Sequence, residues 1–345
     1  MRILIIGGFH LGSLCESYAR AFERLGHEVF RFDSDRAYFQ ASRLAVNPVI
    51  RRLFRPLLWS RVNLSTIEVV RCVRPKLVLS VKGAYLHPET VRHIRVKEGI
   101  SIINYYADNP YCGVPLNPRK TSAQRCDLIQ VLRQYSRVYV WGEHLVKRLE
   151  ADGVSASYLP FGVDSEQYRP FPWDVCEECG KPHAVVFVGQ CGEKRRKHLE
   201  EVRRHQVGLW GPGWERVAKR FGRHRIHAFQ AFGSVSAALY SRAEVSLNIV
   251  DDLNMPGHNM RTFEIPASGG VMLSTYTAEQ AELFPEGEAA WYYRAPSEID
   301  DILEEILGDK EAQGRIRGNA RKIAQDHDYI KRAEGLLKEI IGKTS

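Results

Sequence analysis

The residues with the clearest chemical potential lie in one stretch that begins at His258 and ends at Gly269-Gly270. Residues 259–267 suit a short helix, whose free N–H groups and dipole would favour a diphosphate by about 0.3–1 kcal/mol per exposed charge. Glu264 would lie further along this helix and accept hydrogen bonds from a ribose diol. The candidates for diphosphate binding are His258, Asn259, Met260 and Arg261. The alternative is a capped surface helix with a solvated Glu264.

A second cluster of charged residues, 193–198, contains Arg195, Arg196 and Lys197. The planar guanidinium of an arginine can bind two phosphate oxygens at once. We therefore predict that at least one of these three cations contacts a phosphate. The alternative is the basic, solvated first turn of a helix.

Both clusters belong to a chain in which short apolar strands alternate with helical segments. The predicted strands cover residues 2–6, 28–32, 76–81, 101–106, 138–141, 184–188, 207–210, 245–250 and 271–274. The clearest predicted helices are 14–25 and 326–341. Such alternation indicates βαβ units and an α/β fold with parallel sheets.

The alternation breaks in residues 159–184, which are rich in proline and unsuited to regular structure. We interpret this segment as an interdomain linker. The sequence then predicts two doubly wound, Rossmann-like domains, residues 1–165 and 166–325, followed by a C-terminal helix, 326–345.

Glycine and polar clusters follow the predicted strands, where open parallel sheets bind their ligands. These clusters include Gly7, Gly8, His10, Asp108, Gly189 and Gly211. If the carboxyl ends of two sheets face each other, the clusters converge on one interdomain cleft. That convergence favours an enzyme.

Several short motifs, taken in this order, resemble those of a known family. They are Tyr106-Ala-Asp-Asn-Pro110, Leu159-Pro-Phe-Gly-Val-Asp164 with Tyr168-Arg-Pro170, Arg261-Thr-Phe-Glu264 and Ala267-Ser-Gly-Gly270. The chain resembles retaining GT-B glycosyltransferases of family 4, and within them the CgeB-like (spore-maturation) branch. The resemblance is weakest between residues 36 and 70.

The resemblance implies a glycosyltransferase that moves a sugar from a nucleoside-diphosphate sugar to an acceptor hydroxyl. It implies that Glu264 binds the ribose hydroxyls, and that residues 258–261 and one of residues 195–197 lie beside the diphosphate. Gly7, Gly8 and His10 would face the transferred sugar or the acceptor. Family members commonly carry a second glutamate eight residues before the first, and Pro256 stands there in this chain. The identity of the donor sugar is therefore left open.

The expected mechanism follows from the charge that builds on the departing diphosphate. Fixed cations and helix N–H groups would stabilise that charge in the transition state, so no metal and no other cofactor is expected. In a retaining enzyme the leaving phosphate can take the acceptor's proton. An inverting enzyme would need a base, and Asp108 or His10 could serve. The alternative role for Asp108 is to form an Asp-Asn-Pro turn.

One further motif, Cys176-x-x-Cys179-x-x-x-His183, has metal-like spacing. Structural zinc requires four ligands, and no second CxxC completes this set. Cys191 is the nearest other thiol. A plain exposed loop is therefore the favoured interpretation.

Residues 36–63 contain six arginines and no acidic residue. Apolar residues recur within this segment at helical spacing, which would suit contact with an anionic membrane or an acidic acceptor. Pro56 argues against one continuous helix. The favoured alternative is a pair of helices that pack their apolar faces on the sheet.

Composition sets the remaining expectations. Hydrophobic residues make up 44% and charged residues 26%, as in globular proteins, and no signal peptide or membrane span is evident, so we expect a cytoplasmic protein. The seven scattered cysteines agree, and we expect Cys15, Cys72 and Cys126 to behave as small hydrophobes. The net charge of +8 attracts anions, yet no nucleic-acid-binding module is recognisable.

The expected partners are a nucleotide-sugar donor and a glycan, lipid-linked or small-molecule acceptor. Two rival functions share this fold. One is a nucleotide-sugar epimerase, and the other is a non-catalytic protein that binds a glycan or a protein partner.

Overall fold

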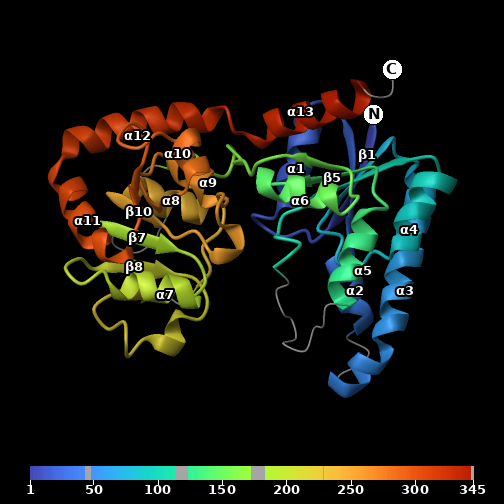
Figure 1. Cartoon of the computed structure of the whole chain (residues 1–345), viewed down its shortest axis with the longest axis horizontal. Coiled ribbons are helices and arrows are strands. Elements are labelled where there is room, and N and C mark those ends of the chain that lie inside the picture. Colours follow the sequence, from blue (N-terminus) through green and yellow to red (C-terminus); the bar gives the residue numbers. More distant parts are fainter. Residues whose placement is uncertain (43–47, 113–122, 172–182, 228, 343–345) are drawn as a thin grey trace. The chain divides into compact units, whose positions relative to one another are not determined.

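The computed structural model describes residues 1–42, 48–112, 123–171, 183–227 and 229–342 (Figure 1). The Cα positions divide the chain into two compact units. The first contains Met1–Pro160 and the chain from Ala333 onward, and the second contains Phe161–Arg332. Each unit is built on one six-stranded parallel sheet, which confirms the predicted fold class. The division of the chain into domains at residues 165 and 325 stays a prediction.

The sheet of the first unit has the strand order β2-β1-β3-β4-β5-β6. Its strands are β1 (Arg2–Gly7), β2 (Glu28–Asp33), β3 (Leu77–Val81), β4 (Ser101–Tyr106), β5 (Arg137–Val140) and β6 (Ala156–Tyr158). The helices are α1 (Leu14–Arg24), α2 (Ser34–Ser42), α3 (Pro48–Val73), α4 (Pro88–Arg92), η1 (His93–Lys97), α5 (Ala123–Leu132) and α6 (Glu143–Ala151). All the pairings are parallel, so every strand of this sheet ends at the same edge.

The sheet of the second unit has the order β12-β11-β10-β7-β8-β9. Its strands are β7 (Val185–Val188), β8 (Val207–Trp210), β9 (Arg225–His227), β10 (Val245–Asn248), β11 (Met272–Thr275) and β12 (Trp291–Tyr293). The α-helices are α7 (Glu193–Glu200), α8 (Ser234–Arg242), α9 (Arg261–Ala267), α10 (Ala278–Leu283), α11 (Ile299–Gly308) and α12 (Lys310–Gln325). Short helical turns are η3 (Trp214–Val217), η4 (Asp252–Asn254) and η5 (Pro296–Glu298).

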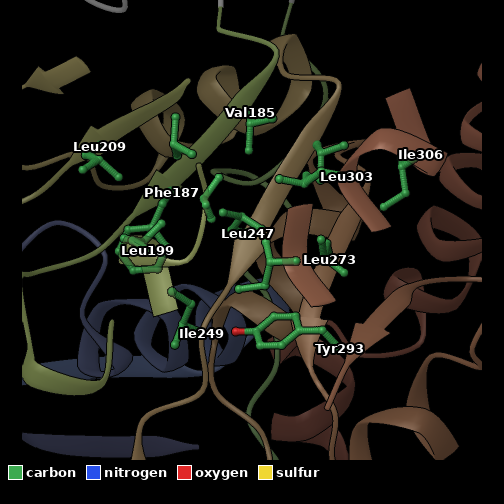
Figure 2. Close-up of a cluster of buried hydrophobic side chains, with 14 of the residues drawn as sticks. Val185, Phe187, Leu199, Leu209, Leu247, Ile249, Leu273, Tyr293, Leu303 and Ile306 are labelled. Carbon is green, nitrogen blue, oxygen red and sulfur yellow. The ribbon is translucent and has the colours of Figure 1, made fainter. Parts of the chain in front are cut away.

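The core of the second unit fixes the strand ends in place. Phe187, Leu247 and Leu273 come from three adjacent central strands and are 0–1% exposed (Figure 2). Leu303 and Ile306 of α11 pack against the same cluster. Because the strands are buried on both faces, their sequences are continuous apolar runs, which is why they are readable from the sequence.

The last helix, α13 (Tyr329–Gly342), is anchored to the first unit through Glu339. Its carboxylate accepts hydrogen bonds from the hydroxyls of Tyr139 (3.1 Å) on β5 and Ser157 (3.2 Å) on β6. The chain therefore returns to the sheet on which it began.

Two expectations about residues of helix α3, Pro56 and Cys72, are wrong. Helix α3 runs without interruption through Pro56. A proline removes one backbone hydrogen bond, and we attribute the continuity to burial of Leu58, Val62 and Val70, which hold the helix against its unit. Cys72 is exposed and not a buried hydrophobe. The side chain of Cys126 lies outside the described residues.

Among the helices that the structure describes, none has the length and apolar character needed to cross a bilayer. α2 and α3 contact each other, and α3 also contacts β1 and β2. This arrangement agrees with the expected pair of packed helices.

Candidate functional site

The loops after β7 and β8 lie together at the carboxyl edge of the second sheet. The Gly189 N–H donates to the Trp210 carbonyl (2.8 Å), and the Gly189 carbonyl accepts from Trp214 Nε1 (2.8 Å). A Cβ added at Gly211 would lie 2.4 Å from the Gly189 carbonyl oxygen. Gly211 is therefore required by a close backbone approach.

Two arginines from different helices are tied to the loop that follows β7. Arg261, the first residue of α9, donates from Nε to the Val188 carbonyl, and Arg195 of α7 donates from Nη1 to the Gln190 carbonyl (3.0 Å). A Cβ at Gly189 would lie 2.8 Å from Arg261 Nη2, so this glycine leaves room for the guanidinium. The two cations thus flank a backbone segment of three residues.

Arg195 carries its charge at a cost. The residue is only 8% exposed, and burial, reinforced by the charge of Arg261, lowers its pKa to about 10. Asp251 lies 3.7 Å from Arg195 Nη2 and compensates in part. The buried Arg195 Nε has no hydrogen-bond partner among the described residues. A buried guanidinium that is repelled by a neighbouring charge and has an unpaired N–H group is suited to bind an anionic ligand.

The other cations of α7 are paired on the helix itself or with the neighbouring loop. Lys197 Nζ lies 2.8 Å from Glu193, and both side chains are largely exposed. Arg196 Nε lies 4.0 Å from Glu200. Lys194 donates to Asp252 (2.7 Å). Of the three predicted phosphate-binding cations, only Arg195 is brought beside Arg261.

Glu264 of α9 is buried, so the alternative interpretation of this residue, a solvated glutamate on a surface helix, is wrong. Burial raises its pKa, whereas the charge of Arg261 and a hydrogen bond from the Tyr168 hydroxyl act in the opposite direction. The Tyr168 oxygen also accepts from the Gly233 N–H (3.3 Å). Tyr240 forms a side-chain hydrogen bond with Arg261. The carboxylate is thus held in a preformed polar setting close to the arginine.

The remaining predicted diphosphate ligands, His258, Asn259 and Met260, directly precede α9. His258 is fully buried, and its Nε2 accepts from the Phe161 N–H (3.1 Å) while Nδ1 lies 3.1 Å from Glu279 Oε1. The Asn259 amide donates to Asn248 Oδ1 (2.9 Å) and its oxygen accepts from the Thr262 N–H (3.3 Å). The polar atoms of both side chains thus have partners inside the unit, and their role as diphosphate ligands stays a prediction. Met260 is half-buried at the start of α9.

The first unit has its own polar cluster at the carboxyl edge of its sheet. A Cβ at Gly8 would lie 2.5 Å from Asp35 Oδ2, and one at Gly7 would lie 2.5 Å from Cys15 Sγ. Lys82, which follows β3 with a left-handed φ of +61°, places Nζ 2.9 Å from Asp108 Oδ2. Both of these side chains are about half exposed.

Asp35 joins this cluster electrostatically. Burial raises its pKa, with a contribution from Asp33, while the charges of His10 and Lys82 act in the opposite direction. His10 and Lys82 therefore lie near one carboxylate that the sequence did not single out, and Lys82 is also paired with Asp108. The one feature of the sequence that could have indicated Asp35 is its position just after a predicted strand. It lies at the border of the segment where the family resemblance is weakest.

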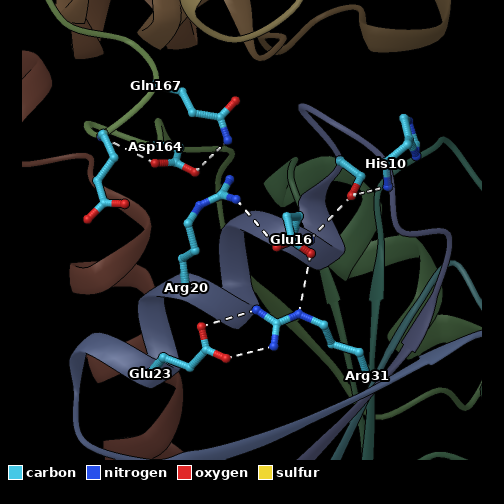
Figure 3. Close-up of polar contacts among 9 residues, drawn as sticks. His10, Glu16, Arg20, Glu23, Arg31, Asp164 and Gln167 are labelled. Atoms are coloured by element: carbon cyan, nitrogen blue, oxygen red, sulfur yellow. Dashed lines mark hydrogen bonds and ion pairs between the residues drawn. The ribbon is translucent and has the colours of Figure 1, made fainter.

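Helix α1 positions His10. The Ser13 hydroxyl accepts from the N–H groups of His10 and Glu16 (both 3.3 Å) and so caps the helix (Figure 3). Glu16 in turn accepts from Arg20 and Arg31 (3.5 and 3.4 Å). The loop that carries His10 is thus fixed by the first turn of a firmly anchored helix.

No group of three or more potential metal-ligating side chains occurs within the described parts of the chain. Cys176 and Cys179 lie outside them. His183 lies within the described residues.

Comparison with known proteins identifies a family for part of the chain and a fold for the whole of it. Residues 194–338 match the model of a family described as glycosyl transferase-like. No curated protein matches the sequence.

Solved structures resemble the whole chain. HepE of Anabaena in complex with UDP-glucose aligns at a TM-score of 0.68 and 13% identity, over 99% of this chain and 100% of that one. Sucrose-phosphate synthase of Thermosynechococcus elongatus aligns at 0.72 and 12%, over 100% of both chains. WaaB, a lipopolysaccharide outer core galactosyltransferase, aligns at 0.59 and 15%, over 99% and 100%.

The chain therefore has the GT-B fold, with two Rossmann-like units and a glycosyl transferase-like segment in its C-terminal part. The assignment to the CgeB-like branch stays a prediction.

Proposed function

We propose that this protein is a glycosyltransferase that transfers a sugar from a nucleoside-diphosphate sugar to an acceptor hydroxyl. The observation that carries the proposal is the pair of arginines, Arg195 and Arg261, tied to the backbone on either side of Gly189. Glu264, held near Arg261, is the proposed ligand of the ribose hydroxyls. HepE was solved with UDP and with UDP-glucose, so UDP-glucose is the first donor to test.

The proposed chemistry uses the arginines as the leaving-group site. When the bond between the anomeric carbon and the phosphate oxygen breaks, negative charge moves onto the diphosphate. The electrostatic interaction of Arg195 and Arg261 with the diphosphate is then stronger in the transition state than in the ground state. An interaction that strengthens in this way lowers the activation free energy. Because the repulsion between them is already present in the empty protein, the diphosphate also relieves it.

We propose a retaining, metal-independent reaction in which the leaving phosphate accepts the acceptor's proton. The acceptor, a glycan, a lipid-linked sugar or a small molecule, would face the cluster of His10, Asp35 and Asp108 in the first unit. If the reaction inverts instead, Asp108 or His10 is the proposed base. Cytoplasmic location and peripheral membrane contact through residues 36–63 also belong to this proposal.

The proposal is tested first by thermal unfolding with UDP, GDP, ADP, CMP and dTDP. A ligand at about 100 times its dissociation constant raises the free energy of unfolding by ~2.7 kcal/mol. We expect one of these nucleotides to stabilise the wild type and to stabilise Glu264→Gln much less, because the neutral amide is a poorer acceptor for the ribose diol. The same nucleotide should retain its effect on Lys197→Gln, a matched control on an exposed side chain.

If none of the nucleotides shifts the unfolding temperature, the nucleotide-sugar proposal is wrong. If one does, hydrolysis and transfer assays with the corresponding sugar nucleotides follow. The anomeric configuration of the product, read by NMR, then decides between retention and inversion.

A further inference from the structure

Two histidines from separate segments face each other on the second sheet. His183 immediately precedes Ala184 and strand β7, and His227 ends the edge strand β9. Their Nε2 atoms are 3.2 Å apart, and the rings are inclined at 74°. Both side chains are half-buried, so they remain accessible from solvent.

The surroundings hold the two rings in position. The Trp210 ring is stacked on the His227 ring at a centroid distance of 4.1 Å and an angle of 3°, and it meets His183 edge-on at 5.4 Å. A Cβ at Gly208 would lie 2.4 Å from Trp210 Cζ3 and 2.8 Å from His183 Cδ2. The absence of a side chain at Gly208 therefore makes the room that the tryptophan and the histidine occupy.

The separation of the two nitrogens matches that of two ligands on one metal ion. Zinc binds histidine nitrogen at about 2.0–2.1 Å, so two nitrogens at a tetrahedral angle lie about 3.3 Å apart. From this geometry we propose that His183 Nε2 and His227 Nε2 bind one divalent transition-metal ion of the zinc class.

The electrostatics of the site favour this class of ion over others. Burial lowers the pKa of both histidines, with Arg225 contributing to each and His183 also to His227, and a neutral imidazole is the form that binds a metal ion. The charge of Arg225 acts against any dication. Binding therefore depends on the affinity of imidazole nitrogen for zinc, cobalt, nickel and copper ions, which magnesium and calcium do not share.

The inference rests on the two histidines alone. The sequence also carries Cys176 and Cys179, seven and four positions before His183, but these residues lie outside the described part of the chain. Without a metal, the same pair is a hydrogen bond in which one ring donates to the other. The experiment must distinguish these two states.

The test is equilibrium dialysis of tag-free protein against Zn²⁺, followed by elemental analysis. We expect about one zinc ion per chain, retained in excess Mg²⁺, and a loss of affinity of more than about tenfold in His183→Ala and in His227→Ala. His144→Ala is the matched control, because His144 also lies edge-on to a tryptophan, Trp141, at 5.5 Å. Absence of binding to the wild type, or unchanged binding in both variants, would overturn the proposal.

A second measurement uses the folded wild-type protein and needs no substitution. Diethyl pyrocarbonate acylates accessible neutral imidazoles, and peptide mass spectrometry locates the modified residues. Zn²⁺ should slow the modification of His183 and His227 in the folded wild type and leave His144 unaffected. Equal modification rates with and without Zn²⁺ would show that the pair is only a hydrogen bond.

Discussion

Replacement of Arg195 by methionine separates a ligand-binding role from a structural one. Methionine keeps an unbranched side chain of similar reach and removes the charge. If Arg195 exists to bind a diphosphate, the empty protein should tolerate the change while nucleotide affinity falls. If Arg195 exists to stabilise the fold, the reverse should hold.

The structure gives the magnitude. Burial and the charge of Arg261 lower the pKa of Arg195 from 12.5 to about 10. At about 1.4 kcal/mol per pKa unit, the charged side chain costs the folded state on the order of 3 kcal/mol. Arginine is protonated in both states at neutral pH, so the whole cost is present there. Methionine removes that cost and also the hydrogen bond to Gln190, which contributes about 1.5–3 kcal/mol.

These two terms nearly cancel, so we expect the unfolding free energy of empty Arg195→Met to lie within about 1–2 kcal/mol of wild type. The lost charge-assisted contact should weaken diphosphate binding by about 10–100-fold. Urea denaturation measures the first quantity. Calorimetric titration with the nucleotide found in the thermal panel measures the second.

Arg196→Met is the matched control, because Arg196 is the next residue on α7 and lies 4.0 Å from Glu200. It should change neither quantity appreciably. The reasoning is refuted if Arg195→Met loses several kcal/mol of stability in the empty protein and still binds the nucleotide with wild-type affinity. Arg195 would then be a structural arginine, and Arg261 alone would remain as the proposed phosphate ligand.

Two further predictions concern stability. Gly211 has a φ of +133° and its added Cβ would lie 2.4 Å from the Gly189 carbonyl oxygen, so Gly211→Ala should cost more than about 2 kcal/mol. Gly314→Ala on α12, where a Cβ meets nothing within 4 Å, should instead stabilise by about 0.5–1 kcal/mol, and equal effects in urea denaturation would contradict the argument. Burial lowers the pKa of His198 and of His327 from 6.5 to about 4. As the pH falls, these histidines are therefore protonated in the unfolded chain before they are protonated in the folded protein. Stability should be complete above pH 6.5 and decrease towards pH 4, by about 2 kcal/mol per histidine at pH 5, and His198→Gln should reduce this slope.

The sequence by itself determined the architecture. Strands buried on both faces of a parallel sheet must be continuous apolar runs, and the helices between them must be amphipathic, so the βαβ order was legible without contacts. Gly189 and Gly211 were legible for a related reason. Each follows a strand end at which an added Cβ would lie within 2.8 Å of a neighbour, the Arg261 guanidinium at Gly189 and the Gly189 backbone at Gly211.

The sequence could place charged residues near the site but could not distinguish their roles. Arg195 and Lys197 are two positions apart and equally basic, yet one is buried against Arg261 and the other lies in a surface ion pair. The sequence predicts His258 as a diphosphate ligand, and only the structure shows that its ring is buried between Phe161 and Glu279. A residue's burial depends on what packs over it, and those neighbours are distant in the sequence.

Tertiary structure alone decided which distant residues meet. Asp35 lies against Gly8 and within the field of Lys82, and His183 lies against His227, which is 44 positions away. No local pattern connects these residues. Helix α3 continues through Pro56 because long-range packing outweighs one lost backbone hydrogen bond. The spacing of apolar residues in the sequence indicates which face of a helix or strand is buried. The chemistry of a site depends instead on distances between side chains, which are set only when the sheets assemble.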